Sequence, residues 1–256
     1  QVRGLGYKGP LLAFFPPADA ADGLSEGFAE LVAADVTLTL VSRPEVDAAA
    51  TAAAHVGRRV NVHLAVDTGM HRRGVAAEKA GDLVERIRAR QELRLAGLYT
   101  HFACADEADK GSARRQAARF GEVANVCRRD GMLLHAANSA AVIDLPESHF
   151  DMVRPGIALY GYQPSDGMHN RLPLRPAMRL VARLMQIRDV PAGERCGYGL
   201  THTFERPSRV GLVPVGYADG YLRSLSNRAS MRVRGQDAPV RGRVSIDQTI
   251  IDLTDI

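Results

Sequence analysis

The chain has little lysine, little cysteine and no long apolar run, and each scarcity excludes a class of function. Only three of the 33 basic residues are lysines, so few side chains are available for covalent chemistry at an amine. The three cysteines show no CxxC or CxxxC spacing, which argues against a structural zinc site and favours a reducing compartment. No run reaches the roughly eighteen apolar residues of a membrane helix, and no signal peptide is visible. We therefore expect a cytoplasmic protein without a membrane partner.

Common catalytic and binding motifs are absent as well. The chain contains no HExxH zinc motif, no Walker loop and no Ser-His-Asp nucleophile elbow. Its formal net charge of +4 is small and spread along the sequence, so we expect no nucleic-acid partner. The remaining composition, with 46% hydrophobic and 24% charged residues, is typical of a soluble globular protein.

Short apolar runs alternate with helical patterns over the first 165 or so residues. Strands of continuous apolar character that alternate with helices predict a parallel sheet with right-handed crossovers. The pattern predicts strands at 11–15, 36–40, 60–66, 95–99 and 133–134, and helices at 27–34, 43–56, 76–90 and 110–129.

Polar residues with chemical potential follow these strands, as at Asp67-Thr68, His101, His135 and Asn138-Ser139. A (β/α)₈ barrel of the TIM type places its active site on such loops, at the C-terminal ends of its strands. A doubly wound open sheet is the alternative, but no GxGxxG turn follows any strand. The fold class predicted for this part is therefore an α/β barrel.

The pattern changes after about Gln163, where Pro164, Pro173 and Pro176 mark a boundary. Beyond it the segments are short, rich in valine and arginine, and separated by turn residues, which predicts an antiparallel β domain. We expect a partial barrel domain over 1–165 and a partial β domain over 166–256.

Two motifs near the domain boundary are candidates for binding an anion. In Arg154-Pro155-Gly156, an arginine at the end of a strand precedes a tight turn whose backbone N–H groups are able to bind a phosphate. A strand-linking turn with a surface arginine explains the same pattern. Ser139 begins an apolar helical run, so it is either an ordinary N-cap or a hydroxyl directed at an anion.

The other candidates also allow two interpretations. His101 is either a core histidine or a site residue, and Arg72 or Arg73 is either a carboxylate clamp or a solvated side chain. Tyr198 and Tyr217, each flanked by glycine, are either structural turn residues or potential bases. A tyrosine acts as a base only where a cation lowers its pKa from about 10.

The motifs, taken in order, resemble those of the alanine racemase family. The resemblance extends over nearly the whole chain, and VRPGIALYG and GYADG are its most specific parts. The matching segments are DTGMHRRG, THFACAD, HAANSAA, DMVRPGIALYGYQP, CGYGLTH, VGYADGYLR and GRVSIDQ. The resemblance implies a (β/α)₈ barrel followed by a β domain, the cofactor pyridoxal 5′-phosphate, and a homodimer with shared active sites.

The resemblance also implies roles for individual residues. Arg154 contacts the pyridine nitrogen of the cofactor and, because arginine only donates hydrogen bonds, keeps that nitrogen unprotonated. Tyr198 is the catalytic tyrosine and acts across the dimer interface. The remaining implied positions are His101 beside the cofactor ring, Ser139, Gly156 and Ile157 around its phosphate, Arg72 near the substrate carboxylate and cofactor hydroxyl, Tyr217 at the substrate channel, and Ile246 as a backbone donor to the substrate carboxylate.

The chain departs from the family pattern at two lysines. The lysine that forms the Schiff base lies in a motif resembling VVKANAYGHG, which is absent, and neither Lys8, Lys79 nor Lys110 replaces it. We therefore expect a chain cut at both ends that is inactive by itself. Ala65 stands where many members have a lysine that positions the arginine equivalent to Arg72.

The function implied is the interconversion of L- and D-alanine for peptidoglycan, by a base on each face of the substrate Cα. A racemase of serine or lysine, and a catalytically inert cofactor-binding homologue or fragment, are the alternatives. A related decarboxylase is disfavoured, because those enzymes lack the VRPGIALYG and GYADG pair.

Overall fold

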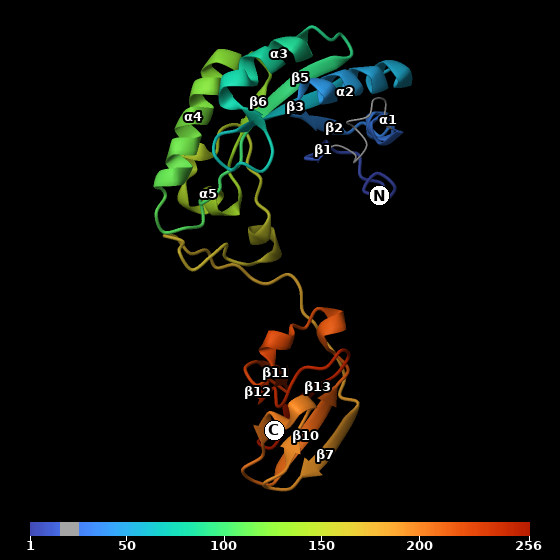
Figure 1. The fold of residues 1–256 in the computed structure, drawn as a ribbon, viewed down its shortest axis with the longest axis vertical. Helices are drawn as coiled ribbons and strands as arrows, with labels where there is room; N and C mark the ends of the chain where they lie inside the picture. The colour runs from blue at the N-terminus through green and yellow to red at the C-terminus, as the bar shows by residue number, and fades with distance from the viewer. Residues whose placement is uncertain (16–25) are drawn as a thin grey trace. The chain divides into compact units, whose positions relative to one another are not determined.

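The computed structural model describes residues 1–15 and 26–256. The chain divides into two compact units, Gln1–Met178 and Arg179–Ile256 (Figure 1). Within the described residues, no helix combines the length and the apolar character needed to cross a membrane.

A parallel sheet forms the centre of the first unit. Its strand order is β1-β2-β3-β5-β6, with β4 paired to the end of β3, and every pair runs parallel. The strands are β1 (Leu12–Ala13), β2 (Thr37–Leu40), β3 (Val60–Asp67), β4 (Val75–Ala76), β5 (Leu93–Tyr99) and β6 (Leu133–His135). Because all strands point the same way, their carboxyl ends meet at one edge of the sheet.

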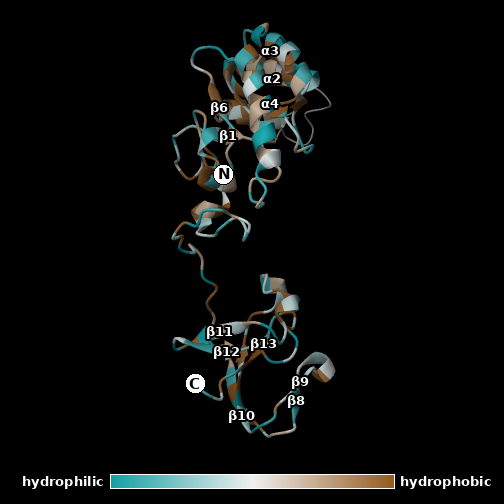
Figure 2. Ribbon diagram, turned by 90° about the vertical axis from the view of Figure 1, so that its left-hand side faces the viewer, coloured by the Kyte–Doolittle hydropathy of each residue, from teal (hydrophilic) through white to brown (hydrophobic). Residues whose placement is uncertain are grey.

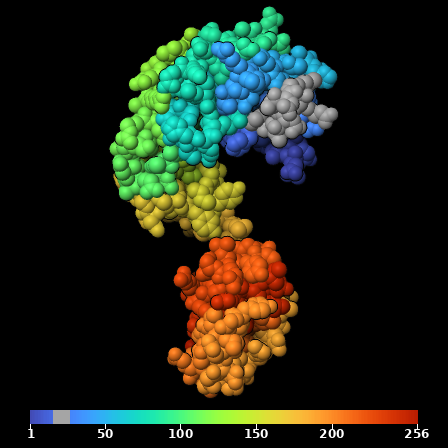
Figure 3. All heavy atoms as spheres, viewed as in Figure 1, coloured from blue at the N-terminus to red at the C-terminus, as the bar shows by residue number. Residues whose placement is uncertain are grey.

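Helices cover the outer side of this sheet, as α2, α3 and α4 show in Figure 1. The helices of this unit are α1 (Glu26–Ala33), α2 (Arg43–Val56), α3 (Ala80–Arg88), α4 (Gly111–Cys127) and α5 (Ser139–Asp144). The cap residues explain the bounds of α2: Ser42 accepts from the Glu45 N–H at its start, and Gly57 adopts the left-handed conformation at its end. Figure 3 shows the first unit curving from its blue N-terminal residues through the green α4 to the yellow residues near 160.

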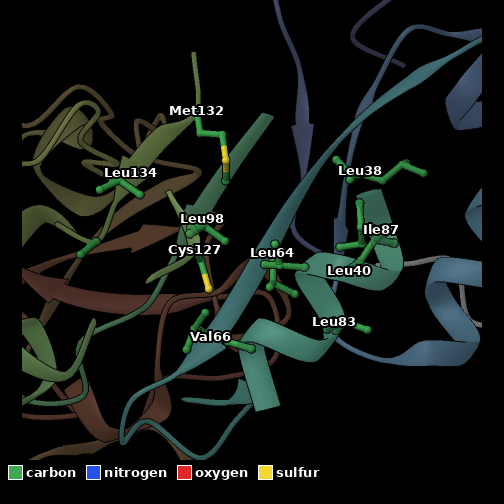
Figure 4. Close-up of a cluster of buried hydrophobic side chains, with 14 of the residues drawn as sticks. Leu38, Leu40, Leu64, Val66, Leu83, Ile87, Leu98, Cys127, Met132 and Leu134 are labelled. Atoms are coloured by element: carbon green, nitrogen blue, oxygen red, sulfur yellow. The ribbon is translucent and has the colours of Figure 1, made fainter. Parts of the chain in front are cut away.

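The core of the first unit lies between the sheet and these helices. Leu83 and Ile87 of α3 lie four residues apart, so they project from one helix face toward strand residues such as Leu40 and Leu64 (Figure 4). Small side chains of α2 take part in the same core, among them Ala49. Burial of this apolar stripe fixes the helices against the sheet.

Antiparallel strands build the second unit. The main sheet has the order β13-β10-β7, and two short pairs, β11-β12 and β8-β9, accompany it. The strands are β7 (Gln186–Val190), β8 (Arg195–Cys196), β9 (His202–Thr203), β10 (Ser208–Val213), β11 (Ser230–Val233), β12 (Gln236–Pro239) and β13 (Thr249–Asp252). A core that includes Val213, Val240 and Ile251 packs beneath them. Figure 2 shows the hydrophobic colours along parts of these strands.

The α/β class of the first part and the β character of the second are confirmed, with differences in detail. The helix predicted at 76–90 begins as a 3₁₀ turn, Ala77–Lys79, and continues as α3. The short strand β4 was not predicted. The strand predicted to end at Arg154 is wrong, because only an isolated bridge between Met152 and His135 precedes that arginine. The domain bounds 1–165 and 166–256 stay a prediction.

Candidate functional site

Arg154 lies at the carboxyl ends of β5 and β6 and is surrounded by neutral acceptors. Its backbone N–H donates to the Ala137 carbonyl at 2.8 Å, which fixes the loop against the residues that follow β6. Its Nη2 donates to the carbonyls of Thr100, at 2.8 Å, and Ala136, at 3.1 Å. Burial lowers the pKa of Arg154 to about 10, so the guanidinium stays charged at neutral pH. Within the described residues this charge has no carboxylate partner.

Two buried histidines form a hydrogen-bonded chain that begins at the Arg154 guanidinium. Nη1 of Arg154 lies 2.6 Å from Nδ1 of His135, and Nε2 of His135 lies 2.8 Å from Nδ1 of His63. The Tyr99 ring stacks on His135 with 4.8 Å between centroids and lies 5.1 Å from the Arg154 guanidinium carbon. Burial, together with the Arg154 charge, lowers the pKa of His63 to about 4 and that of His135 to about 2. Both rings are therefore neutral at physiological pH.

His101 lies on the other side of the guanidinium, in the loop that follows β5. Its Nδ1 is 3.3 Å from Nη2 of Arg154, and burial is the main cause of a pKa lowered to about 4. The side chain of Gln116 holds this loop: its Nε2 donates to the His101 carbonyl at 2.9 Å, and its Oε1 accepts from the Ala103 N–H at 2.9 Å. The partly buried His101 ring thus belongs to the polar cluster around Arg154. The backbone carbonyl of His101 is held by Gln116 of α4.

Ser139 does not cap its helix. Asn138 is the N-cap of α5 and accepts from the Ala141 N–H at 3.1 Å, so the N-cap interpretation of Ser139 is wrong. The Ser139 hydroxyl instead accepts from the backbone N–H groups of Gly156, at 2.7 Å, and Ala158, at 3.2 Å.

This serine keeps its own hydroxyl hydrogen available, because both of its contacts are accepted ones. A Cβ at Gly156 would meet no atom within 4 Å, so the backbone there borders open space. Ile157, which follows, is exposed at the start of the 3₁₀ turn Ile157–Tyr160.

The two arginines of the β3–β4 loop have different environments. Arg73 forms an ion pair with Glu45 at 3.2 Å, and Glu45 also accepts from the Val41 N–H at 2.8 Å. Arg72 is exposed and, within the described residues, its guanidinium has no hydrogen-bond or ion-pair partner. Its charge contributes to the lowered pKa of His101, which associates it with the same cluster. Arg72, rather than Arg73, is thus available for a ligand.

The second unit positions the remaining candidates. The Tyr217 N–H donates to the Ser245 carbonyl at 3.0 Å, and the Ala218 N–H donates to the Ile246 carbonyl at 2.8 Å, so Tyr217 and Ile246 lie side by side. A Cβ at Gly216 would lie 2.4 Å from the Ile246 carbonyl oxygen, which explains the glycine before Tyr217. Both side chains are exposed.

Tyr198 begins a 3₁₀ turn and is 72% exposed, which makes its phenol accessible. The glycines on either side, Gly197 and Gly199, both have positive φ near 70°. They also approach a neighbouring segment closely, because a Cβ at Gly197 would lie 3.2 Å from the Arg243 backbone nitrogen. The glycines of CGYGLTH therefore present the tyrosine at the end of a tight turn.

The structure thus gathers His101, Ser139, Arg154, Gly156 and Ile157 at one edge of the first unit, and Tyr217 with Ile246 in the second. Tyr198 lies in the second unit on a separate turn. Sequence reasoning missed His63 and Tyr99, although a histidine inside the apolar run VNVHLAV is a signal that was available. No cluster of His, Cys, Asp or Glu suited to a metal ion occurs among the described residues.

Two family models match the chain. The model of the alanine racemase N-terminal domain matches residues 2–164, and that of the alanine racemase C-terminal domain matches residues 177–256. The alanine racemase of Desulfovibrio desulfuricans is 40% identical over 260 residues, which are 100% of this chain and 68% of that protein. The alanine racemase of Halothermothrix orenii is 44% identical over 198 residues, which are 76% of this chain and 52% of the relative.

Solved structures agree with these sequence matches. The alanine racemase of D-cycloserine-producing Streptomyces lavendulae gives a TM-score of 0.87 at 32% identity, over 100% of this chain and 67% of that one. The alanine racemase from E. faecalis gives 0.87 at 32% identity, over 100% and 68%. The chain spans between about half and about two thirds of the length of these four relatives.

Proposed function

The chain belongs to the alanine racemase family, and from this premise we propose that it is the larger part of a pyridoxal-phosphate-dependent enzyme that interconverts L- and D-alanine. The observation that supports the cofactor site best is the partly buried Arg154, a charged group held only by neutral acceptors. A group with a lone pair and an anionic tail, such as a pyridine with a phosphate, complements this arginine and the adjacent Ser139–Gly156 loop.

Arg154 has hydrogens left for a ligand. Its Nε donates to no described residue, so an N–H remains to be donated to the ring nitrogen. A guanidinium only donates, so the nitrogen that it contacts stays unprotonated. Pyridoxal phosphate, when bound, supplies the electron sink that makes the Cα–H bond of an amino acid acidic.

The phosphate is proposed to bind where the Ser139 hydroxyl contacts the backbone of the loop at Gly156. The Ser139 hydroxyl donates to a phosphate oxygen while its lone pairs keep the loop N–H groups in place. We assign the backbone around Gly156 and Ile157 to the same role, because that backbone borders open space. His101 lies beside the ring, and Arg72 binds the substrate carboxylate and the cofactor hydroxyl.

Tyr198 is proposed to exchange a proton with the substrate Cα on one face, with Tyr217 and the Ile246 backbone delimiting the substrate. A base on the other face is needed, and none of the three lysines suits this role. Lys8 and Lys79 are exposed on loop or turn segments, and Lys110 is buried in an ion pair with Asp144. We propose that these 256 residues alone do not racemise alanine.

We propose further that the active form is a homodimer, with Tyr198 of one protomer serving the other protomer's cofactor site, and that it works in the cytoplasm. The three unpaired cysteines suit a reducing compartment. D-alanine for peptidoglycan is the proposed product. Serine and lysine are the alternative substrates, because side chains near Tyr217 and Ile246 limit substrate size.

The test is racemisation of L- and D-alanine by the 256-residue chain and by a longer protein that joins it to the family's lysine-bearing strand. We expect activity only from the longer protein, and Tyr198→Phe should lower kcat by about 10²–10⁴-fold. Tyr221→Phe is the matched control, because the buried Tyr221 hydroxyl has no hydrogen-bond partner among the residues that the structure describes.

Three outcomes would count against the proposal. Unchanged turnover in Tyr198→Phe contradicts the role of that tyrosine. Faster racemisation of serine or lysine than of alanine corrects the substrate. A longer protein that binds pyridoxal phosphate but racemises no amino acid overturns the activity.

A further inference from the structure

The hydrogen-bonded chain from Arg154 through His135 to His63 is buried at its far end. His135 is 0% exposed and His63 is 5% exposed. The two contacts are short, at 2.6 Å from Arg154 to His135 and 2.8 Å from His135 to His63. Polar groups that are buried this completely need each hydrogen in its proper place, since a wrongly placed one faces another donor.

The chemistry of arginine fixes the protons along this chain. A guanidinium only donates, so Nδ1 of His135 must accept and carry no hydrogen. Neutral His135 then carries its hydrogen on Nε2 and donates it to His63. Nδ1 of His63 must therefore accept, which leaves the hydrogen of His63 on Nε2. Any other neutral arrangement sets two donors or two acceptors against each other.

The fold makes room for His63 at this place. His63 of β3 pairs in register with Gly97 of β5, and a Cβ at residue 97 would lie 2.7 Å from the imidazole ring. Glycine at 97 therefore leaves the space beside the neighbouring strand that the His63 ring occupies. Tyr99, two residues on, stacks against His135 and donates its own hydroxyl to Thr39 at 3.3 Å.

We infer that His63 is a positioning residue of the cofactor site: its Nδ1 accepts from Nε2 of His135, holds that ring where its Nδ1 accepts from Arg154, and so fixes the guanidinium. The inference rests on the proposed function for its effect on the cofactor. The assignment of the proton positions stands independently of any cofactor.

Two substitutions separate this role from simple packing. His63→Asn keeps an acceptor oxygen near the position of Nδ1, whereas His63→Leu keeps apolar volume and removes the acceptor. His55→Leu is the control, because His55 is an exposed residue near the end of α2. The 256-residue chain is used throughout.

The first measurement is nitrogen NMR of the chain with labelled histidine. In the unsubstituted chain and in His63→Asn we expect one His135 tautomer, with hydrogen on Nε2. In His63→Leu we expect the same tautomer, because Arg154 still donates to Nδ1, but the Nε2–H of His135 then lacks its acceptor and its resonance shifts. A hydrogen on Nδ1 of His63 in the unsubstituted chain, or an unchanged Nε2–H resonance of His135 in His63→Leu, overturns the inference.

The second measurement is titration with pyridoxal 5′-phosphate, followed by its absorbance. Loss of one buried hydrogen bond should weaken binding roughly ten-fold in His63→Leu, while His63→Asn and His55→Leu stay within about two-fold. Equal affinities of His63→Leu and the unsubstituted chain overturn the link between His63 and the cofactor. If no variant binds but the His135 resonances behave as expected, the cofactor site proposed for this chain fails and the positioning role of His63 on Arg154 stands.

Discussion

Lys110 and Asp144 form an ion pair that is almost entirely removed from water. Their side chains are 1% and 0% exposed, and Nζ lies 2.8 Å from Oδ2. Burial opposes ionisation of Asp144, but hydrogen bonds from Lys110, His169 and Asn170 outweigh it and lower the carboxyl pKa to about 2. The pair thus joins the start of α4 to the end of α5 and to the loop at 169–170.

Removing the cation alone should be costly, because it leaves a buried charge with fewer partners. We expect Lys110→Met to lower the free energy of unfolding by roughly 3–5 kcal/mol. Arg114 lies on α4, and Arg114→Met, which breaks its exposed ion pair with Glu147, should cost at most about 1 kcal/mol. Urea denaturation of the two variants measures the difference, and similar losses would show that the buried pair has no special weight.

Single residues mark the limit of what the sequence predicts. Arg154 and Ser139 were identified as candidates because their neighbours, Pro155-Gly156 and an apolar helix, suggest an anion site. Lys110 was interpreted only as a residue at a helix start, because its partner lies 34 positions away and no local pattern connects them. His63 was missed for the same reason: its partner His135 is brought near by sheet pairing.

Whole elements were easier to predict than single contacts. The alanine-rich stretch after Arg43-Pro44 located α2, and a continuous apolar run located β3, because both elements bury most of their apolar residues. The two-residue β4 has too few residues to show a period. The turns that present Tyr198 and Tyr217 depend on glycines whose tight contacts lie far along the chain, so their conformation was not predictable from local pattern.

The β3–β4 loop depends on a glycine that no other residue can replace. Gly74 has φ +143°, and a Cβ there would lie 2.5 Å from the backbone nitrogen of Asp67. Gly57, at the end of α2, also has positive φ, but a Cβ added there would meet no atom within 4 Å. A side chain at Gly57 would therefore cause backbone strain alone, whereas one at Gly74 would cause both strain and a steric collision.

We expect Gly57→Ala to cost about 1 kcal/mol of stability, from the left-handed conformation alone. Gly74→Ala should cost roughly 3 kcal/mol or more, since the collision is with backbone that cannot rotate away. It should also weaken cofactor binding, because the loop carries Arg72. Chemical denaturation and cofactor titration of both variants test this, and equal losses from the two would contradict the steric argument.

At the scale of the whole chain, the residues proposed for the function belong to two separate units. The proposed cofactor groups and Arg72 belong to the first, and Tyr198, Tyr217 and Ile246 belong to the second. The two family models likewise match an N-terminal and a C-terminal part of the chain. The histidine cluster lies wholly in the first unit, as do all α-helices of the described residues. The chain has no tryptophan whose fluorescence would follow unfolding. Helical circular dichroism is therefore the suitable signal, and it reports on the unit that contains the histidine cluster.

That cluster should make the fold sensitive to mild acid. The pKa is about 4 for His63 and His101 and about 2 for His135, mainly because of burial, against an ordinary value of 6.5. Below about pH 6.5 these histidines therefore bind protons in the unfolded chain but not in the folded chain. Their full contribution to the free energy of unfolding is present above that pH, and it decreases as the pH drops toward 4. Each histidine contributes at most about 1.4 kcal/mol per pH unit in this window.

The carboxylates act in a lower window, which makes the two effects separable. Asp47, Asp67 and Asp144 have pKa values lowered from 3.8, so their contribution is lost only below about pH 4. Urea unfolding followed by circular dichroism between pH 7.5 and 4.5 should thus show a decline that His63→Asn makes shallower by one titrating group. A stability that stays constant from pH 7 to 5 would mean that the histidines take up protons in the folded chain. The single set of proton positions from Arg154 to His63 would then be wrong, because a protonated His135 has no acceptor to offer the guanidinium.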